Sequence, residues 1–159
     1  MPRPFLLVLV CSFLLTGCTA TARLYPVQGP LSEQNPPPIY VAKFSDGLHS
    51  GVFSATLSNG EIGKGRWQQI PRPNKTANPV ASSAAADSLA PEWDLVYGQG
   101  FYTAHVLGSR LYARVDFTGD RGTVMHAEFY KPDKAQEQSI SSIKGVAKDD
   151  KGNIYKVAF

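Results

Sequence analysis

The chain has 159 residues, 43% of them hydrophobic, with 16 Lys and Arg against 13 Asp and Glu and a formal net charge of +3. This length and composition fit one globular domain and exclude a collagen, a coiled coil and a wholly disordered chain. The net positive charge is small and the basic residues are scattered, which argues against nucleic acid as a partner, and two cysteines cannot make a disulfide-rich scaffold. We therefore expect one domain that binds no nucleic acid.

The amino terminus has the pattern of a secretory signal. Arg3 follows the first Met, and an apolar stretch of about 11 residues then runs to Leu15. A helix that crosses a bilayer needs about 20 apolar residues, so this stretch is too short for a transmembrane anchor. The small residues Thr16 and Gly17 and the cysteine Cys18 end the signal.

Leu15-Thr16-Gly17-Cys18 resembles the lipobox of bacterial lipoproteins. The resemblance implies a signal peptide over 1–17, cleavage between Gly17 and Cys18, and a diacylglyceryl group on the Cys18 thiol. It also implies an outer-membrane location, facing either the periplasm or the cell surface, because Thr19 stands where inner-membrane lipoproteins carry Asp. The lipid bilayer is then an expected partner. The alternative is an ordinary secretory signal that ends by chance in a cysteine.

Residues 18–38 read as a tether between the lipidated cysteine and the domain. They contain Pro26, Gly29, Pro30 and the triplet 36–38, and they show no apolar period. Such a stretch cannot bury a core, and the proline triplet favours extended backbone. The alternative is that 24–27 packs onto the domain.

The predicted domain spans 39–159 and is mainly β. A β-rich segment covers 39–44, and three hairpins follow, made by 51–58 with 61–70, 111–118 with 123–130, and 143–148 with 154–159. Apolar and polar residues alternate along these segments, as in half-buried strands. Asn59-Gly60 favours a type I′ hairpin turn. We expect a small antiparallel barrel or sandwich built from these hairpins.

Two segments interrupt the strand pattern. Residues 71–90 are rich in Pro, Asn, Ser and Ala, which predicts a long, flexible and disordered inserted loop. A short helix is expected over 91–98, with Pro91 at its first position and Gly98 at its end. Residues 101–107 fit either a continuation of this helix or a strand.

The search for chemistry yields no catalytic site. The three histidines lack the spacing of a metal site, and no nucleophile elbow or phosphate loop is present. His126 and Glu128 share a strand face, but a polar pair on a solvent face is the commoner explanation. We therefore expect no catalytic residues, metal or cofactor, and a protein that is more plausibly not an enzyme.

Four tyrosines are the candidate ligand-binding residues, namely Tyr102, Tyr112, Tyr130 and Tyr155. Together they would make an exposed aromatic strip that stacks on a glycan or peptide. The competing interpretation is that they pack in the core. Joint exposure would favour ligand binding, and complete burial would exclude it.

A second resemblance covers most of the domain. Segments 51–67, 93–94, 97–102, 119–123, 145–147 and 152–156 are similar to a group of small, uncharacterised bacterial lipoproteins. The group has no assigned activity and brings no catalytic residues. We therefore predict a membrane-anchored, non-enzymatic structural or interaction module with an envelope protein or glycan as partner. The alternatives are a lipoprotein that binds a small ligand or glycan and, more weakly, a hydrolase.

Overall fold

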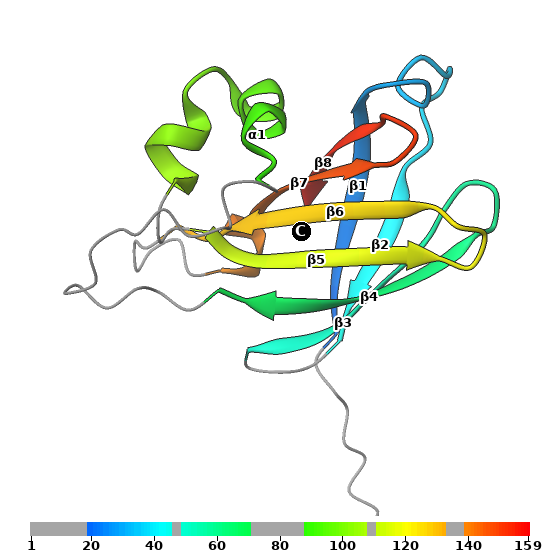
Figure 1. Cartoon of the computed structure of the whole chain (residues 1–159), viewed down its shortest axis with the longest axis horizontal. Coiled ribbons are helices and arrows are strands. Elements are labelled where there is room, and N and C mark those ends of the chain that lie inside the picture. The colour runs from blue at the N-terminus through cyan, green and yellow to red at the C-terminus, as the bar shows by residue number, and fades with distance from the viewer. Residues whose placement is uncertain (1–18, 46–48, 71–87, 108–110, 133–138) are drawn as a thin grey trace, which may run out of the picture.

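A computed structural model shows a closed barrel of eight antiparallel strands, and it describes residues 19–45, 49–70, 88–107, 111–132 and 139–159. Each strand pairs with the next along the chain, and β8 pairs with β1 to close the sheet (Figure 1). The strands are β1 (Ala20–Gln28), β2 (Tyr40–Phe44), β3 (Ser50–Thr56), β4 (Ile62–Gln69), β5 (Leu111–Gly119), β6 (Val124–Tyr130), β7 (Lys144–Asp149) and β8 (Ile154–Ala158). The prediction of a mainly β antiparallel domain is confirmed, and its architecture is a barrel.

β1 is the main departure from the sequence prediction. The tether expected over 18–38 is wrong for residues 20–28, which pair with both β2 and β8. Ala22 and Leu24 are buried inside the barrel and alternate with exposed residues, as in any half-buried strand. Pro26 hides this pattern in the sequence. It sits beside a register shift against β8, an irregularity at which a residue without an N–H is tolerated.

The three predicted hairpins are present and share one turn geometry. In each, the N–H of a glycine donates to the carbonyl three residues earlier, and that glycine has positive φ: Gly60 +76°, Gly122 +92° and Gly152 +83°. These are three-residue connections whose last residue is left-handed. The type I′ turn expected at Asn59-Gly60 is therefore wrong, since Asn59 does not have positive φ. Its side chain instead accepts a hydrogen bond from the N–H of Glu61.

The three turns close one end of the barrel, which we call the closed end. The residue after each turn glycine is buried: Glu61, Thr123 and Asn153. Polar side chains thus fill this end, whereas apolar ones fill the rest of the interior.

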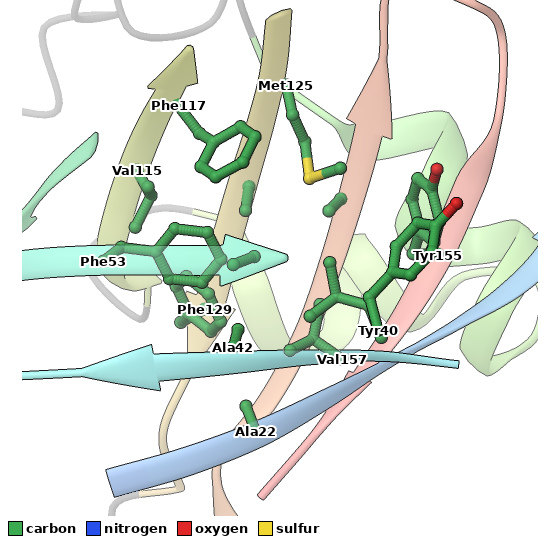
Figure 2. Packing of buried hydrophobic residues seen from close by; sticks show 14 of the residues in the cluster. Ala22, Tyr40, Ala42, Phe53, Val115, Phe117, Met125, Phe129, Tyr155 and Val157 are labelled. Atoms are coloured by element: carbon green, nitrogen blue, oxygen red, sulfur yellow. The ribbon is translucent and has the colours of Figure 1, made fainter. Parts of the chain in front are cut away.

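Every strand contributes to the apolar interior. Figure 2 shows part of this packing. Phe53 and Phe117 meet edge to face, with ring centroids 5.5 Å apart. Gly63 makes room for this packing, because a Cβ at that position would collide with the Phe117 ring. Tyr40 and Tyr155 lie together nearer the closed end, with centroids 5.9 Å apart.

A helical segment packs against the outside of β7 and β8 (Figure 1). It consists of α1 (Ala90–Tyr97) and a π-helical turn, η2 (Tyr102–Val106); a short 3-10 turn, Ile140–Ser142, precedes β7. The helix predicted over 91–98 is confirmed within one residue at each end, and η2 shows that 101–107 is helical. The insert predicted over 71–90 ends in this helix at Ala90, and residues 71–87 lie outside the described part of the chain. None of the described helices is long and apolar enough to cross a membrane.

Candidate functional site: an apolar cavity at the barrel mouth

The end of the barrel opposite the three hairpin turns holds a cavity of about 390 Å³. We call this end the mouth. The first residues of odd-numbered strands and the last residues of even-numbered strands meet there, because the chain runs up and down around the barrel. The described residues that line the cavity are Thr19, Ala20, Phe44, Ser45, Trp67, Tyr112, Ala113, Phe129, Ile140, Ile143 and Phe159.

The cavity wall is built around Phe44, the last residue of β2. Its ring meets Phe53 and Phe129 edge to face, at centroid distances of 4.9 and 5.3 Å, and lies 5.1 Å from Phe159. Phe53 and Phe129 are fully buried, whereas Phe44 and Phe159 are half-buried. Offset and edge-to-face aromatic pairs are favourable packings, so these rings form a defined wall.

Two contacts fix the rim of the mouth. The Trp67 indole N–H donates to the Ser45 carbonyl at 3.2 Å, which holds the tryptophan across from β2. The Lys131 ammonium lies 5.6 Å from the centre of the Tyr112 ring. A cation at this distance over an aromatic face is attracted to it, so a positive charge is held beside the apolar wall.

The side chains that line the cavity are mainly apolar. Its side-chain polar groups are the hydroxyls of Thr19, Ser45 and Tyr112 and the indole N–H of Trp67. This N–H already donates a hydrogen bond to the Ser45 carbonyl. No Asp, Glu, His or Cys is among the described lining residues. Apolar surface of this kind takes up apolar groups by removing them from water.

The closed end carries a buried carboxylate, Glu61. It accepts hydrogen bonds from the Thr123 backbone N–H at 2.9 Å and hydroxyl at 2.7 Å, and from Asn59 and the Arg121 N–H. Burial alone raises the pKa of Glu61, but the bonds from Thr123, Asn59 and Arg121 outweigh it and lower the pKa to about 2. The carboxylate is therefore ionised and joins two hairpin turns.

A second polar group at the closed end centres on Asp149. Its oxygens accept from the backbone N–H groups of Lys151 and Asn153, from the Asn153 amide and from the Tyr155 hydroxyl at 2.7 Å. Burial and the bond to Asp149 raise the pKa of Tyr155. These groups border a cavity of about 380 Å³, but they satisfy one another, and every buried polar side-chain atom among the described residues has a partner. We conclude that this network holds the turns together.

A third cavity, of about 400 Å³, lies outside the barrel on β5 and β6. His126 and Glu128 both line it, the arrangement that a hydrolase would require. Each already has partners: Arg114 and the Trp93 indole bind Glu128 at 3.1 and 2.9 Å, and His126 lies 2.7 Å from an Asp116 oxygen. The described lining includes no hydroxyl or thiol nucleophile.

The four candidate tyrosines do not form one surface. Tyr102 and Tyr130 lie outside the barrel beside α1, where the Tyr102 hydroxyl accepts from Ser88 at 2.8 Å. Tyr112 lines the mouth, and Tyr155 is buried at the closed end with 1% of its surface exposed. The shared aromatic strip is thus wrong as a set, and only Tyr112 belongs to the candidate site.

The remaining predicted site residues, Gly17 and Cys18, lie outside the described residues. No three His, Cys, Asp or Glu side chains in the described ranges gather where they could hold a metal ion. Sequence reasoning missed the mouth residues Phe44, Trp67 and Phe159. The signal that would identify them is their common position at strand ends that an up-and-down barrel brings together.

Comparisons of the chain with protein-family models, with curated proteins and with solved structures found no match.

Proposed function

We propose that the protein is a non-enzymatic binding protein that takes a small apolar ligand into its mouth. We also propose that a lipid on Cys18 anchors it to a membrane, and the lipobox resemblance favours the outer membrane. The observation that carries the ligand is the apolar cavity of about 390 Å³. Ligand pockets are typically about 300–1,000 Å³ and mostly apolar, with a few polar groups that orient the ligand. The mouth fits this description.

The barrel architecture supports the same function. Closure removes sheet edges, so a peptide strand has no unpaired strand to extend. The end of the barrel remains as the place where a ligand can enter between strands. Eight-stranded barrels have an interior wide enough for one small ligand where side chains do not fill it. We therefore favour a small ligand over a glycan stacked on surface tyrosines.

The ligand proposal is tested by filling the cavity from one wall. Ala20 lines the mouth and Thr21, the next residue of β1, is exposed on the outer face, so Ala20→Phe and Thr21→Phe place the same ring on opposite sides of the sheet. A chain that begins at Thr19 contains all eight strands and suits this assay. An uncharged apolar fluorophore, N-phenylnaphthylamine, should bind wild type and Thr21→Phe equally.

Ala20→Phe should weaken fluorophore binding by at least about tenfold, equivalent to about 1.4 kcal/mol. Circular dichroism and a thermal melt would establish that the variant is folded. Equal binding by both variants, or no saturable binding by wild type, would contradict the proposed ligand site.

The anchor is tested separately in cells. Cys18→Ala should abolish labelling by a fatty-acid probe and release the protein from the outer-membrane fraction, because two or three acyl chains give essentially permanent attachment. Labelling that persists in Cys18→Ala would refute the lipoprotein assignment without bearing on the cavity.

A further inference from the structure

We infer that the mouth of the barrel lies against the bilayer and that its ligand is an acyl chain of an anionic membrane lipid. This inference rests on the proposed function and names its substrate class and the direction from which the ligand arrives.

The predicted lipid anchor lies next to the mouth along the chain. Thr19 and Ala20 both line the cavity, and β1 begins at Ala20. Cys18 directly precedes Thr19, and consecutive Cα atoms are about 3.8 Å apart. A lipid on Cys18 is therefore attached at the rim of the mouth, with no spacer that would let the barrel turn its mouth away.

The mouth end of the barrel carries positive charge. Lys43 is the penultimate residue of β2, Lys131 follows the end of β6, and Lys144 begins β7, so three lysines lie at the mouth ends of their strands. The Lys144 ammonium lies 5.6 Å from the centre of the Tyr97 ring on α1, outside the barrel. The acidic residues of these three strands are Glu128 on β6 and Asp149 at the far end of β7, and the Glu128 oxygens are bound by Arg114 and Trp93.

The closed end carries more acidic than basic residues near its hairpin turns. Glu61, Asp120, Asp149 and Asp150 lie on or beside its hairpin turns, against Arg121 and Lys151. A barrel with lysines at its mouth and carboxylates at its closed end orients in the field of an anionic bilayer with the mouth towards the lipid.

One lysine of the mouth contacts the cavity wall itself. Lys131 lies over the ring of Tyr112, and Tyr112 lines the cavity, so a cation stands at the boundary between apolar wall and rim. This arrangement suits an amphiphile whose chain enters the cavity while its anionic headgroup stays beside Lys131. A lipid therefore fits this arrangement at least as well as a wholly apolar molecule does.

The test uses the acylated mature protein, which begins at Cys18, in vesicles of anionic phosphatidylglycerol with bromine on the acyl chains. The chain has two tryptophans: Trp67 lines the mouth, and Trp93 belongs to α1 and is buried against the outside of the barrel. Bromine quenches fluorescence at short range. We expect quenching in wild type and in Trp93→Phe, and none in Trp67→Phe, which retains only Trp93.

Charge is tested with variants of equal net change on the chain that begins at Thr19. Lys43→Gln with Lys131→Gln should weaken binding to phosphatidylglycerol vesicles about tenfold, whereas Lys64→Gln with Arg121→Gln should change it less than about twofold. Equal losses in both pairs would overturn the orientation of the mouth.

Unquenched Trp67 in vesicles would also overturn the inference. The proposed function would stand in that case if the barrel still bound N-phenylnaphthylamine in a manner sensitive to Ala20→Phe. Loss of both signals would remove the ligand site itself, and mass measurement of the purified protein reports Cys18 acylation independently.

Discussion

Glu61→Ala is the substitution for which the structure gives the sharpest expectation of stability. The Glu61 carboxylate is completely buried and joins its own turn to the β5–β6 turn through Thr123 and Arg121. Removing it leaves the Thr123 N–H and hydroxyl, both buried, without their acceptor. Each buried donor left unpaired costs about 1–3 kcal/mol, so we expect a loss of about 2–6 kcal/mol in the free energy of unfolding.

Urea denaturation of the chain that begins at Thr19 measures this loss, with two variants as controls. Glu61→Gln keeps one oxygen for the backbone donors and should lose less than about 2 kcal/mol. Glu33→Ala alters an exposed carboxylate and should stay within about 0.5 kcal/mol of wild type. A loss in Glu61→Ala no larger than that in Glu33→Ala would refute the assignment of Glu61 as the link between the turns.

The same carboxylate predicts a pH dependence. Its pKa is about 2 in the folded barrel, against an ordinary value of 4.5. Because folding lowers the pKa, the ionised group stabilises the barrel above pH 4.5, and this contribution disappears as the pH falls from 4.5 towards 2. Stability should therefore decline less over this interval in Glu61→Gln than in wild type; parallel declines would contradict the lowered pKa.

Two further substitutions test the packing of the barrel wall. Gly63→Ala should cost about 1–3 kcal/mol, because its methyl group collides with the Phe117 ring; an unchanged melting temperature would show that the ring has room to move. Trp93→Phe removes the indole donor that Glu128 accepts at 2.9 Å, and should cost about 1–3 kcal/mol. In Glu128→Gln the same change at Trp93 should cost less, and equal costs in a double-mutant cycle would argue against coupling.

The hairpins of this barrel could be predicted because their information is local. Period-two alternation marks the strands, and a glycine closes each turn, as at Gly60, Gly122 and Gly152. The first strand could not be recognised in the same way. Its Pro26 resembles a linker residue until the neighbouring register shift, which depends on β8 at the far end of the chain, is known.

The candidate site escaped prediction for a related reason. Phe44, Trp67 and Phe159 are separated along the chain, and each alone resembles an ordinary core residue. They meet only because every second strand ends at the mouth of a closed barrel. The tyrosines failed as a guide because residue type does not report position: Tyr112 reached the mouth, whereas Tyr155 became part of the closed end.

The most direct test of the account is to locate a bound chain. Crystals of the barrel grown with 12-bromododecanoate would place the bromine by its anomalous scattering. We predict one peak inside the mouth, among Phe44, Trp67 and Phe129, with the carboxylate towards Lys131. A saturated complex whose bromine lies only on the outer surface, or at the closed end, would contradict the central claim that the mouth is the ligand site.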